Sequence, residues 1–408
     1  MPGNGGLALP SEWYKFLARP TQFEWVRRII SGRQEVSQFS MSKPNNILIY
    51  RIGSLGDTVV ALPCFHLIAR RFPDSRRILL TNLPVHAKAP AAASVLENSG
   101  LVDCVLDYSV GKRNIVQLTK LWWRIRRLRV STLVYLVPPR GESAAKRDEK
   151  FFRSCGVKEI IGTPFGELAH HAYDPVTNRY EAEASRLARC LAPLGDAHLH
   201  DPASWDLRLT SQEQARSASV LRPLKGEPFL VLGIASKMSA TDWGVENWKR
   251  LMPMLQREFP EHAAVFIGAK QDRAVCDQVA ARWPGRWMNL SGELSPRESA
   301  AVIRQGDLFL GPDSGPMHLA ASVGTVCVAI FSARNRPGLW FPFGNDHQIL
   351  YHQTECFGCN LEVCSIAMKK CILSVSAEEV IAAARQTKAR HMAMARSQPA
   401  EVVEASTS

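Results

Sequence analysis

The chain has 408 residues, of which 46% are hydrophobic and 22% are charged, a composition that is typical of globular proteins and excludes a largely disordered one. Its 50 lysines and arginines against 38 acidic residues give a formal net charge of +12, which indicates an anionic partner: nucleic acid, an acidic membrane surface or an anionic substrate. No stretch approaches the roughly 18 uninterrupted apolar residues of a membrane span, and the N-terminus lacks a signal-peptide pattern, so we expect a cytoplasmic protein.

The first 43 residues precede the first predicted strand and combine aromatic and aliphatic residues with several arginines. This pattern predicts one or two amphipathic helices, a helical extension in front of the globular domains. Two interpretations stay open: these helices pack on the body of the protein, or they anchor it at a membrane surface.

Strands and helices alternate twice along the rest of the chain. The first series has predicted strands at 46–50, 77–81, 104–107 and 132–137, and a predicted helix at 58–71. The second series has predicted strands at 228–234, 263–268, 307–310 and 325–331, and predicted helices at 245–258, 272–283, 296–305 and 316–323. Because such alternation builds parallel sheets, we predict an α/β protein with two Rossmann-like domains. The polar stretch at 201–226 indicates their junction, so we place the domains at 44–210 and 211–392, and a disordered tail at 393–408.

A phosphate-binding helix start is predicted at 311–321, between two strands of the second series. Free backbone N–H groups and the positive end of the helix dipole suit a phosphate there. Ser314 and Gly315 allow its close approach, Pro316 fits the first helical turn, and His318 reaches back as a donor. The alternative is an ordinary capped helix with a buried histidine. The convergence of acidic, hydroxyl, glycine and histidine residues favours a functional site.

The loop Gly53–Asp57 follows the first predicted strand, at the edge where parallel sheets place their ligands. It is not the glycine-rich fingerprint of dinucleotide enzymes, and no acidic residue follows at the strand end that would hold a ribose, so we set an NAD site aside. The loop offers the Asp57 carboxylate on a turn flanked by glycines. The alternative role of Asp57 is to cap the following helix.

One lysine and one basic segment each have more than one interpretation. Lys237 follows the first strand of the second series, on the side of the 311–321 segment, and either reaches a pyrophosphate or is a solvated surface lysine. Residues 120–129 place five basic residues among two tryptophans and several aliphatic residues. That pattern is typical of a nucleic-acid surface, of a membrane surface, or of a helix that packs on the sheet and has a basic outer face.

The ten cysteines fall into two groups. Six are scattered, mostly inside apolar runs, and we predict that they are small core residues: Cys64, Cys104, Cys155, Cys190, Cys276 and Cys327. Four crowd near the C-terminus: Cys356, Cys359, Cys364 and Cys371. Their spacing is compatible with a tetrahedral thiolate site for zinc or iron, and the alternative is a buried reduced cluster or a redox pair.

Residues 47–57 with Leu62-Pro63, together with 311–321, resemble glycosyltransferase family 9, the bacterial ADP-heptose:lipopolysaccharide heptosyltransferases. The likeness runs from about residue 45 to about 385 and includes Asn289–Gly292 and the spacing of the cysteine cluster. The resemblance implies a GT-B fold, with the acceptor on the first domain, the nucleotide-sugar on the second and the chemistry in a central cleft. It also implies an inverting transfer that requires no metal or other cofactor.

The resemblance also implies roles for individual residues. Asp57 takes the position of the general base, and its loop on the acceptor side comprises Gly53, Ser54, Leu55 and Gly56. Asp313 would touch the donor sugar, while Ser314, Gly315 and His318 would hold the phosphates. The full donor-binding set is Ser236, Lys237, Asp272, Asp313, Ser314, Gly315, Pro316, Met317 and His318.

Two positions depart from the family pattern. Thr241 stands where the family usually has a lysine, two residues before a tryptophan, and Lys237 is the candidate substitute. The acidic residue expected to contact the ribose is Asp272, with Gln271 as its competitor.

We therefore expect an enzyme that transfers a sugar onto a lipopolysaccharide-core-type acceptor. The sugar we expect first is heptose, from ADP-heptose. An anionic, lipid-linked acceptor fits the basic chain and would place the enzyme in peripheral contact with the cytoplasmic face of the inner membrane. Alternatives within the family are a protein acceptor or another nucleotide-sugar. A nucleic-acid-binding protein is the alternative from a different class, and its binding would depend strongly on salt and not on Asp57, Ser314 or His318. A nucleotide-sugar sensor without catalysis is disfavoured by the presence of Asp57.

Overall fold

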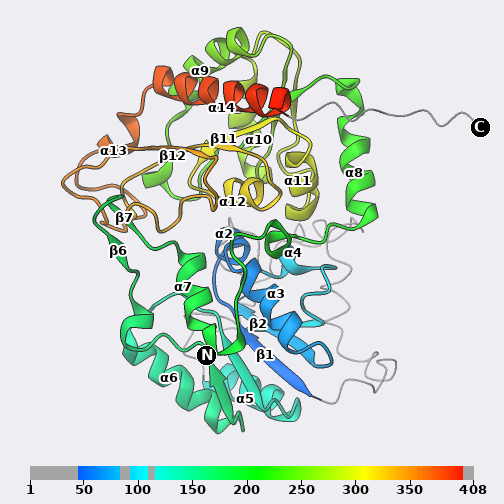
Figure 1. Cartoon of the computed structure of the whole chain (residues 1–408), viewed down its shortest axis with the longest axis vertical. Coiled ribbons are helices and arrows are strands. Elements are labelled where there is room, and N and C mark those ends of the chain that lie inside the picture. Colours follow the sequence, from blue (N-terminus) through cyan, green and yellow to red (C-terminus); the bar gives the residue numbers. More distant parts are fainter. Residues whose placement is uncertain (1–44, 83–91, 109–114, 398–408) are drawn as a thin grey trace, which may run out of the picture. The chain divides into compact units, whose positions relative to one another are not determined.

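The computed structural model describes residues 45–82, 92–108 and 115–397, of which the side chains are described up to residue 389 (Figure 1). Asn45–Ser408 form one compact unit. The predicted helical extension at 1–43 lies outside the described residues, as does the end of the predicted tail. No helix within the described ranges is long and apolar enough to cross a membrane.

The first sheet has five parallel strands in the order β3-β2-β1-β4-β5. They are β1 (Asn46–Tyr50), β2 (Arg76–Asn82), β3 (Cys104–Tyr108), β4 (Thr132–Tyr135) and β5 (Glu159–Ile161). The accompanying helices are α2 (Leu55–Val59), α3 (Leu62–Arg71), α4 (Ala93–Leu96), α5 (Ile115–Arg127), α6 (Glu142–Ser154) and α7 (Glu183–Cys190). Side chains of β1 alternate between two cores: Leu48 packs with residues of α5 and α6, and Ile49 packs with residues of α3 and α7. Parallel sheets need this cover on both faces, which is why their strands are apolar throughout.

The second sheet has six parallel strands in the order β10-β9-β8-β11-β12-β13. They are β8 (Phe229–Leu232), β9 (Ala263–Phe266), β10 (Trp287–Asn289), β11 (Leu308–Pro312), β12 (Cys327–Phe331) and β13 (Gln348–Tyr351). Its helices are α8 (Ser211–Leu221), α9 (Val245–Glu258), α10 (Arg273–Ala280), α11 (Pro296–Ile303), α12 (Gly315–Ser322), α13 (Lys370–Leu373) and α14 (Ala377–Ser397). Helices α9, α10 and α14 share one core with this sheet, and α11 and α12 share the other. The two predicted Rossmann-like sheets are thus confirmed.

Short elements lie in the connection between the two sheets and in several loops. A two-stranded hairpin comprises β6 (Tyr173–Asp174) and β7 (Arg179–Tyr180). The 3-10 helices are Gly166–Ala169, Ala192–Leu194, Pro202–Trp205, Arg222–Leu224, Ser239–Thr241 and Lys270–Asp272.

Several elements differ from those predicted. The single helix predicted at 58–71 is two helices, α2 and α3, because Pro63 at the second position of α3 has no N–H with which to continue the hydrogen-bond ladder from α2. The short strands β5, β10 and β13 have few fully buried residues, so their apolar pattern was too weak to predict. Helix α14 extends to Ser397, into the predicted disordered tail.

A buried arginine joins elements from both sheets. Arg297 is the second residue of α11 and is only 2% exposed. Its guanidinium contacts the carboxylate of Glu213 on α8, with a distance of 2.6 Å between Nε and Oε1. It also donates to the carbonyl oxygens of Val95 and Leu207, at 2.9 and 2.8 Å. One side chain therefore ties α11 to α8, to α4 and to the segment before α8.

Candidate functional site

The Asp57 loop leaves the carboxyl end of β1 and turns directly into α2. Gly53 has φ of 146°, and a Cβ atom there would lie 2.5 Å from the Cβ of Asp57, so only glycine fits. The Oδ2 atom of Asp57 accepts hydrogen bonds from the backbone N–H and the hydroxyl of Ser54, both at 2.6 Å. Ser54, and not Asp57, is the N-cap residue of α2, so the predicted alternative of Asp57 as the N-cap is wrong; Asp57 lies at the third helical position and accepts from the backbone N–H of Ser54 as part of a capping box. Among the described residues the other oxygen of Asp57, Oδ1, has no hydrogen-bond partner.

The buried charges beneath this loop were not predicted from the sequence. Arg51 is fully buried and donates to the carbonyl oxygen of Leu136 at 2.6 Å and to that of Asp57. Near it lies a buried ion pair, Glu183–Arg186, at 2.7 Å. Burial alone would raise the pKa of Glu183, but hydrogen bonds from Arg186 and from His171 outweigh it and lower that pKa to about 2. The one available signal was a charged residue, Arg51, directly after an apolar strand.

The start of α12 has the features of an anion-binding site. Ser314 is its N-cap residue, with φ of −155° and ψ of 167°, yet its side chain makes no capping hydrogen bond. The Ser314 hydroxyl is buried and has no partner among the described residues. Pro316 lies within the first two helical positions, where its missing N–H costs nothing. Met317 is fully buried in the core, so its side chain is a packing residue and not a donor contact.

The Asp57 loop and the start of α12 meet in the structure. Helix α2 packs against α12. A Cβ atom on Gly56 would lie 2.8 Å from the Cδ2 atom of His318, so glycine is required for this approach. The Nε2 atom of His318 lies 3.9 Å from an oxygen of Asp313. Two segments that were predicted separately, one from each sheet, are therefore neighbours.

Burial shifts the pKa values of Asp313 and His318 and so determines their protonation. Burial raises the pKa of Asp313 to about 6, against the charge of Arg334 and a hydrogen bond from Asn335, whose amide donates at 3.2 Å. Burial lowers the pKa of His318 to about 4, so its imidazole is neutral at neutral pH and donates through one N–H only. Asn335 was missed from the sequence because it follows β12, outside both motifs.

Replacing Asp313 with asparagine should change how stability depends on pH. Since the folded pKa of Asp313 lies near 6 and the ordinary value is 3.8, the protonated carboxyl contributes stability below pH 3.8 that is lost as the pH rises through 6. We expect Asp313→Asn to gain about 2 kcal/mol in free energy of unfolding relative to the wild type between pH 4.5 and pH 8, measured by urea denaturation. Asp196→Asn, at an exposed aspartate, is the control and should show no such trend. Parallel pH profiles for Asp313→Asn and the wild type would contradict the prediction.

The other predicted donor residues lie in loops after β8 and β9. The Ser236 hydroxyl contacts the hydroxyl of Thr241 and the carbonyl oxygen of Met238, so it stabilises its own turn. Lys237 is exposed and makes no hydrogen bond or ion pair with the described residues. The Oδ2 atom of Asp272 accepts from the backbone N–H of residue 269 at 2.8 Å, which holds the 3-10 turn after β9.

The cysteine segment borders the loop that contains Ser236 and Lys237. The amide of Ala240 donates to the carbonyl oxygen of Glu362 at 3.0 Å, and the ammonium of Lys369 donates to the carbonyl oxygen of Asp242 at 3.0 Å. A lysine thus reaches the Thr241–Trp243 stretch from a segment distant in sequence, which the sequence did not indicate.

The four clustered cysteines are half-buried free thiols: Cys356, Cys359, Cys364 and Cys371. The Cys364 sulfur accepts a hydrogen bond from the backbone N–H of Lys369 at 3.2 Å. Across the described ranges, no group of three or more His, Cys, Asp or Glu side chains is placed to hold a metal ion. The zinc or iron site predicted from the spacing therefore has no support in the structure. Of the six scattered cysteines, all are buried except Cys104, which is half-buried, as expected for small core residues.

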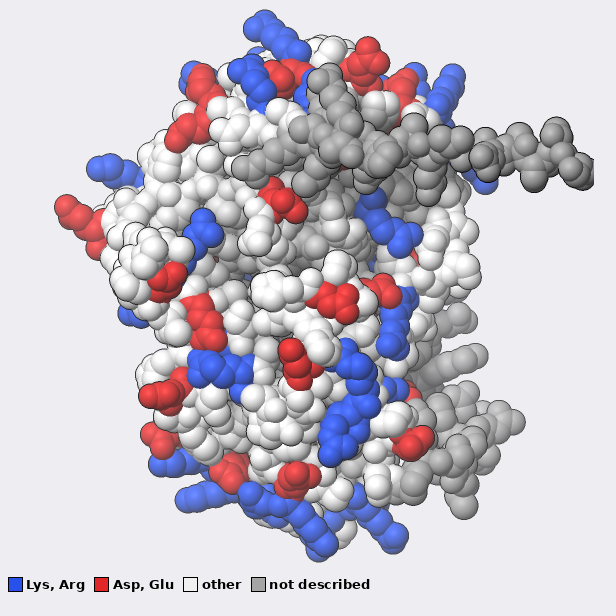
Figure 2. Space-filling model, viewed as in Figure 1, with Lys and Arg blue, Asp and Glu red and all other residues white. Residues whose placement is uncertain are grey.

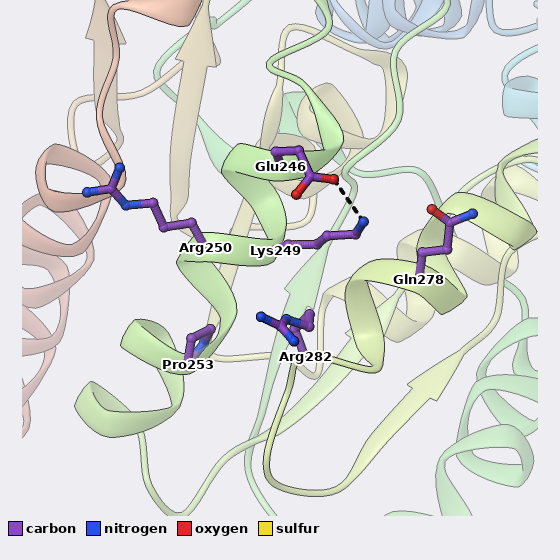
Figure 3. A pocket seen from close by; sticks show the side chains of 6 residues that line it. All are labelled: Glu246, Lys249, Arg250, Pro253, Gln278 and Arg282. Atoms are coloured by element: carbon purple, nitrogen blue, oxygen red, sulfur yellow. Dashed lines mark hydrogen bonds and ion pairs between the residues drawn. The ribbon is translucent and has the colours of Figure 1, made fainter.

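A shallow pocket of about 800 Å³ lies between α9 and α10, and none of the predicted site residues lines it (Figure 3). Its lining residues are Glu246, Lys249, Arg250, Pro253, Gln278 and Arg282. Figure 3 shows Lys249 directed at Glu246, at 2.8 Å. Arg250 is paired with Glu378 at 2.9 Å. With two of its three cations already paired to carboxylates, this pocket is a weaker anion site than the start of α12.

Known proteins resemble this chain over both halves. The model of glycosyltransferase family 9 (heptosyltransferase) matches residues 185–370, which include the 311–318 segment but not Asp57. Lipooligosaccharide heptosyltransferase 2 of Campylobacter jejuni is 27% identical over 341 residues, which are 81% of this chain and 94% of that protein. A lipopolysaccharide core heptosyltransferase of Haemophilus influenzae is 24% identical over 141 residues, 35% of this chain and 40% of that protein.

The fold is also found among solved structures. A family 9 glycosyl transferase from Veillonella parvula superposes with a TM-score of 0.66 at 16% identity, over 86% of this chain and 99% of that one. Its likeness confirms the predicted arrangement of two Rossmann-like sheets, the GT-B fold. The family match over residues 185–370, the relatives and the fold all point to glycosyltransferase family 9, which this chain resembles.

Proposed function

We propose that the chain transfers heptose from ADP-heptose to a saccharide acceptor of the lipopolysaccharide-core type, with inversion at the anomeric carbon. The observation that carries this proposal is the contact between the Asp57 loop and the start of α12, where the buried Ser314 hydroxyl has no partner among the described residues. A free carboxylate oxygen and an anion site as neighbours are what a displacement reaction needs. The similarity to heptosyltransferases that act on lipooligosaccharide and on the lipopolysaccharide core supports the choice of sugar and of acceptor class.

In this mechanism the Oδ1 atom of Asp57 takes the proton of the acceptor hydroxyl as its oxygen attacks the anomeric carbon. The bond from that carbon to the phosphate oxygen breaks on the opposite side, and the nucleoside diphosphate leaves with the bonding electrons. Its growing negative charge is stabilised by the N-terminus of α12, the Ser314 hydroxyl and an N–H of neutral His318. One direct displacement inverts the configuration, and the steps described use only this chain's own residues.

The remaining donor contacts are assigned by position. Asp313 contacts the sugar, and we propose Lys237 for the pyrophosphate because it is exposed and makes no bond to the described residues. Asp272 follows β9 and is proposed for the ribose. The net charge of +12 supports an anionic, lipid-linked acceptor and peripheral contact with the cytoplasmic face of the inner membrane.

Calorimetric titration with a panel of nucleotide-sugars tests the donor site. ADP-heptose should bind more tightly than ADP-glucose and UDP-glucose. His318→Ala should weaken ADP-heptose by about 10- to 100-fold, because a hydrogen bond to a charged group contributes about 1.5–3 kcal/mol. His198→Ala, at an exposed histidine, is the matched control and should bind as the wild type does. The proposal fails if no nucleotide-sugar binds, and tighter binding of a different sugar would replace heptose as the donor.

A further inference from the structure

Helix α5 exposes large apolar side chains to solvent. The exposed fractions are 79% for Ile115, 59% for Val116, 43% for Leu118 and 53% for Trp123. Only Leu121 and Ile125 are buried in the core beneath the helix. Scattered apolar residues at a surface need no explanation, but four on one short helix form a patch that indicates an interaction.

Basic residues share the outer face of α5 with this patch. Val116, Lys120, Trp123 and Arg127 follow the spacing i, i+4, i+7 and i+11, which places them on one face of the helix. The guanidinium of Arg127 lies 5.9 Å from the ring centre of Trp123. Within the described part of the chain, neither Lys120 nor Arg127 has an ion-pair partner.

The helix contains no acidic residue, so its charge has one sign throughout. Two more of its arginines are already engaged: Arg124 is 3.6 Å from a carboxylate oxygen of Asp107, and Arg126 lies over the ring of Trp122. Figure 2 shows lysines and arginines gathered along the lower end of the view, where Figure 1 draws α5 and α6. Exposed tryptophan and aliphatic residues among unpaired cations match the interface of an anionic bilayer, apolar below and negatively charged at its surface.

We infer that the outer face of α5, formed by Val116, Lys120, Trp123 and Arg127, docks the enzyme on an anionic phospholipid surface. A nucleic acid also offers negative charge, but it supplies no apolar layer for Val116 and the aliphatic residues beside it. The topology of the first sheet relates the docking face to the proposed base. Helix α5 follows β3 and the Asp57 loop follows β1, and both strands are parallel members of one sheet. Both α5 and the Asp57 loop therefore follow strands whose carboxyl ends lie at the same edge of that sheet.

Sedimentation of the full chain with lipid vesicles tests this inference. The wild type should bind phosphatidylcholine vesicles that contain phosphatidylglycerol, weakly bind those without it, and lose affinity as salt is added. Lys120→Glu with Arg127→Glu should weaken binding at least about 25-fold, since each basic residue near an acidic bilayer contributes about fivefold. Trp123→Ala should weaken the part of the binding that persists at high salt.

The matched control is Arg216→Glu with Arg304→Glu, which changes the net charge equally at two exposed arginines associated with the second sheet. It should bind within about threefold of the wild type, because charges beyond a Debye length of the bilayer are screened. Equal weakening by both double variants would reduce the effect to net charge and overturn the inference. So would a Trp123→Ala variant with a lower Tm and unchanged vesicle binding, or a wild type that binds duplex nucleic acid through α5 but not vesicles.

The inference extends the proposed transfer to a lipid-linked acceptor, but the two fail separately. Vesicle binding is measured without donor or acceptor. In a parallel assay with a lipid-free saccharide acceptor, the Lys120→Glu, Arg127→Glu variant should transfer heptose as fast as the wild type. If the wild type itself transfers nothing, the proposed function fails while the docking surface stands.

Discussion

Replacing Asp57 with asparagine is expected to slow sugar transfer by about 10²- to 10⁴-fold, the usual contribution of a positioned general base. The amide cannot take a proton from the acceptor hydroxyl, but its oxygen can still accept the two hydrogen bonds from Ser54 that cap α2. The affinity for the donor should therefore remain within about threefold of the wild type, since no bond to the pyrophosphate is removed. Rates of nucleoside diphosphate release and calorimetry with ADP-heptose measure the two quantities.

The choice of asparagine separates chemistry from folding. Alanine would also remove the capping box of α2 and move the loop that contacts His318. Asp74→Asn, at an exposed aspartate of the same half, is the matched control and should transfer at the wild-type rate. Equal loss of transfer and of donor affinity in Asp57→Asn would mean that this residue belongs to the donor site, and the assignment of the base would be wrong.

Replacing Arg297 with alanine is expected to lower the free energy of unfolding by about 3–5 kcal/mol, because it leaves a half-buried carboxylate without its partner and buried carbonyl oxygens without their donor. The carboxylate is that of Glu213, and the carbonyl oxygens of Val95 and Leu207 lose their donor as well. Hydrogen bonds from Arg297 hold the pKa of Glu213 below its ordinary value against the effect of burial, so the carboxylate stays charged at neutral pH. Urea denaturation followed by circular dichroism measures the loss.

The control for Arg297 is an arginine in an exposed ion pair in the same half of the protein, at the start of α10. Arg273 lies 2.8 Å from Glu293, and both side chains are more than 40% exposed. Solvent screens such a pair, so Arg273→Ala should cost less than about 1 kcal/mol. A loss for Arg297→Ala no larger than that of the control would show that Arg297 does not hold α11 to α8.

The apolar runs and the turn residues of the sequence were sufficient to predict the two sheets and to identify both site segments. Buried parallel strands such as 46–50 and 263–266 are continuous apolar stretches, and the helix predicted at 245–258 coincides with α9. Pattern was insufficient where burial is partial, as in β13, or where one proline divides an apolar stretch, as at Pro63. The spacing of four cysteines was compatible with a metal, but spacing does not determine where the thiols point, and the described residues form no such site.

Local sequence thus specifies this protein's strands, its helix starts and the chemical groups they present, because these depend on neighbours within a few residues. Asp57 and His318 were recognisable separately on that ground. The two residues become neighbours because α2 packs against α12. That packing places Gly56, which has no Cβ, against the imidazole of His318, and it forms only when the two sheets come together. The same is true of the pKa values of Asp313 and His318, because burial by residues distant in sequence shifts them.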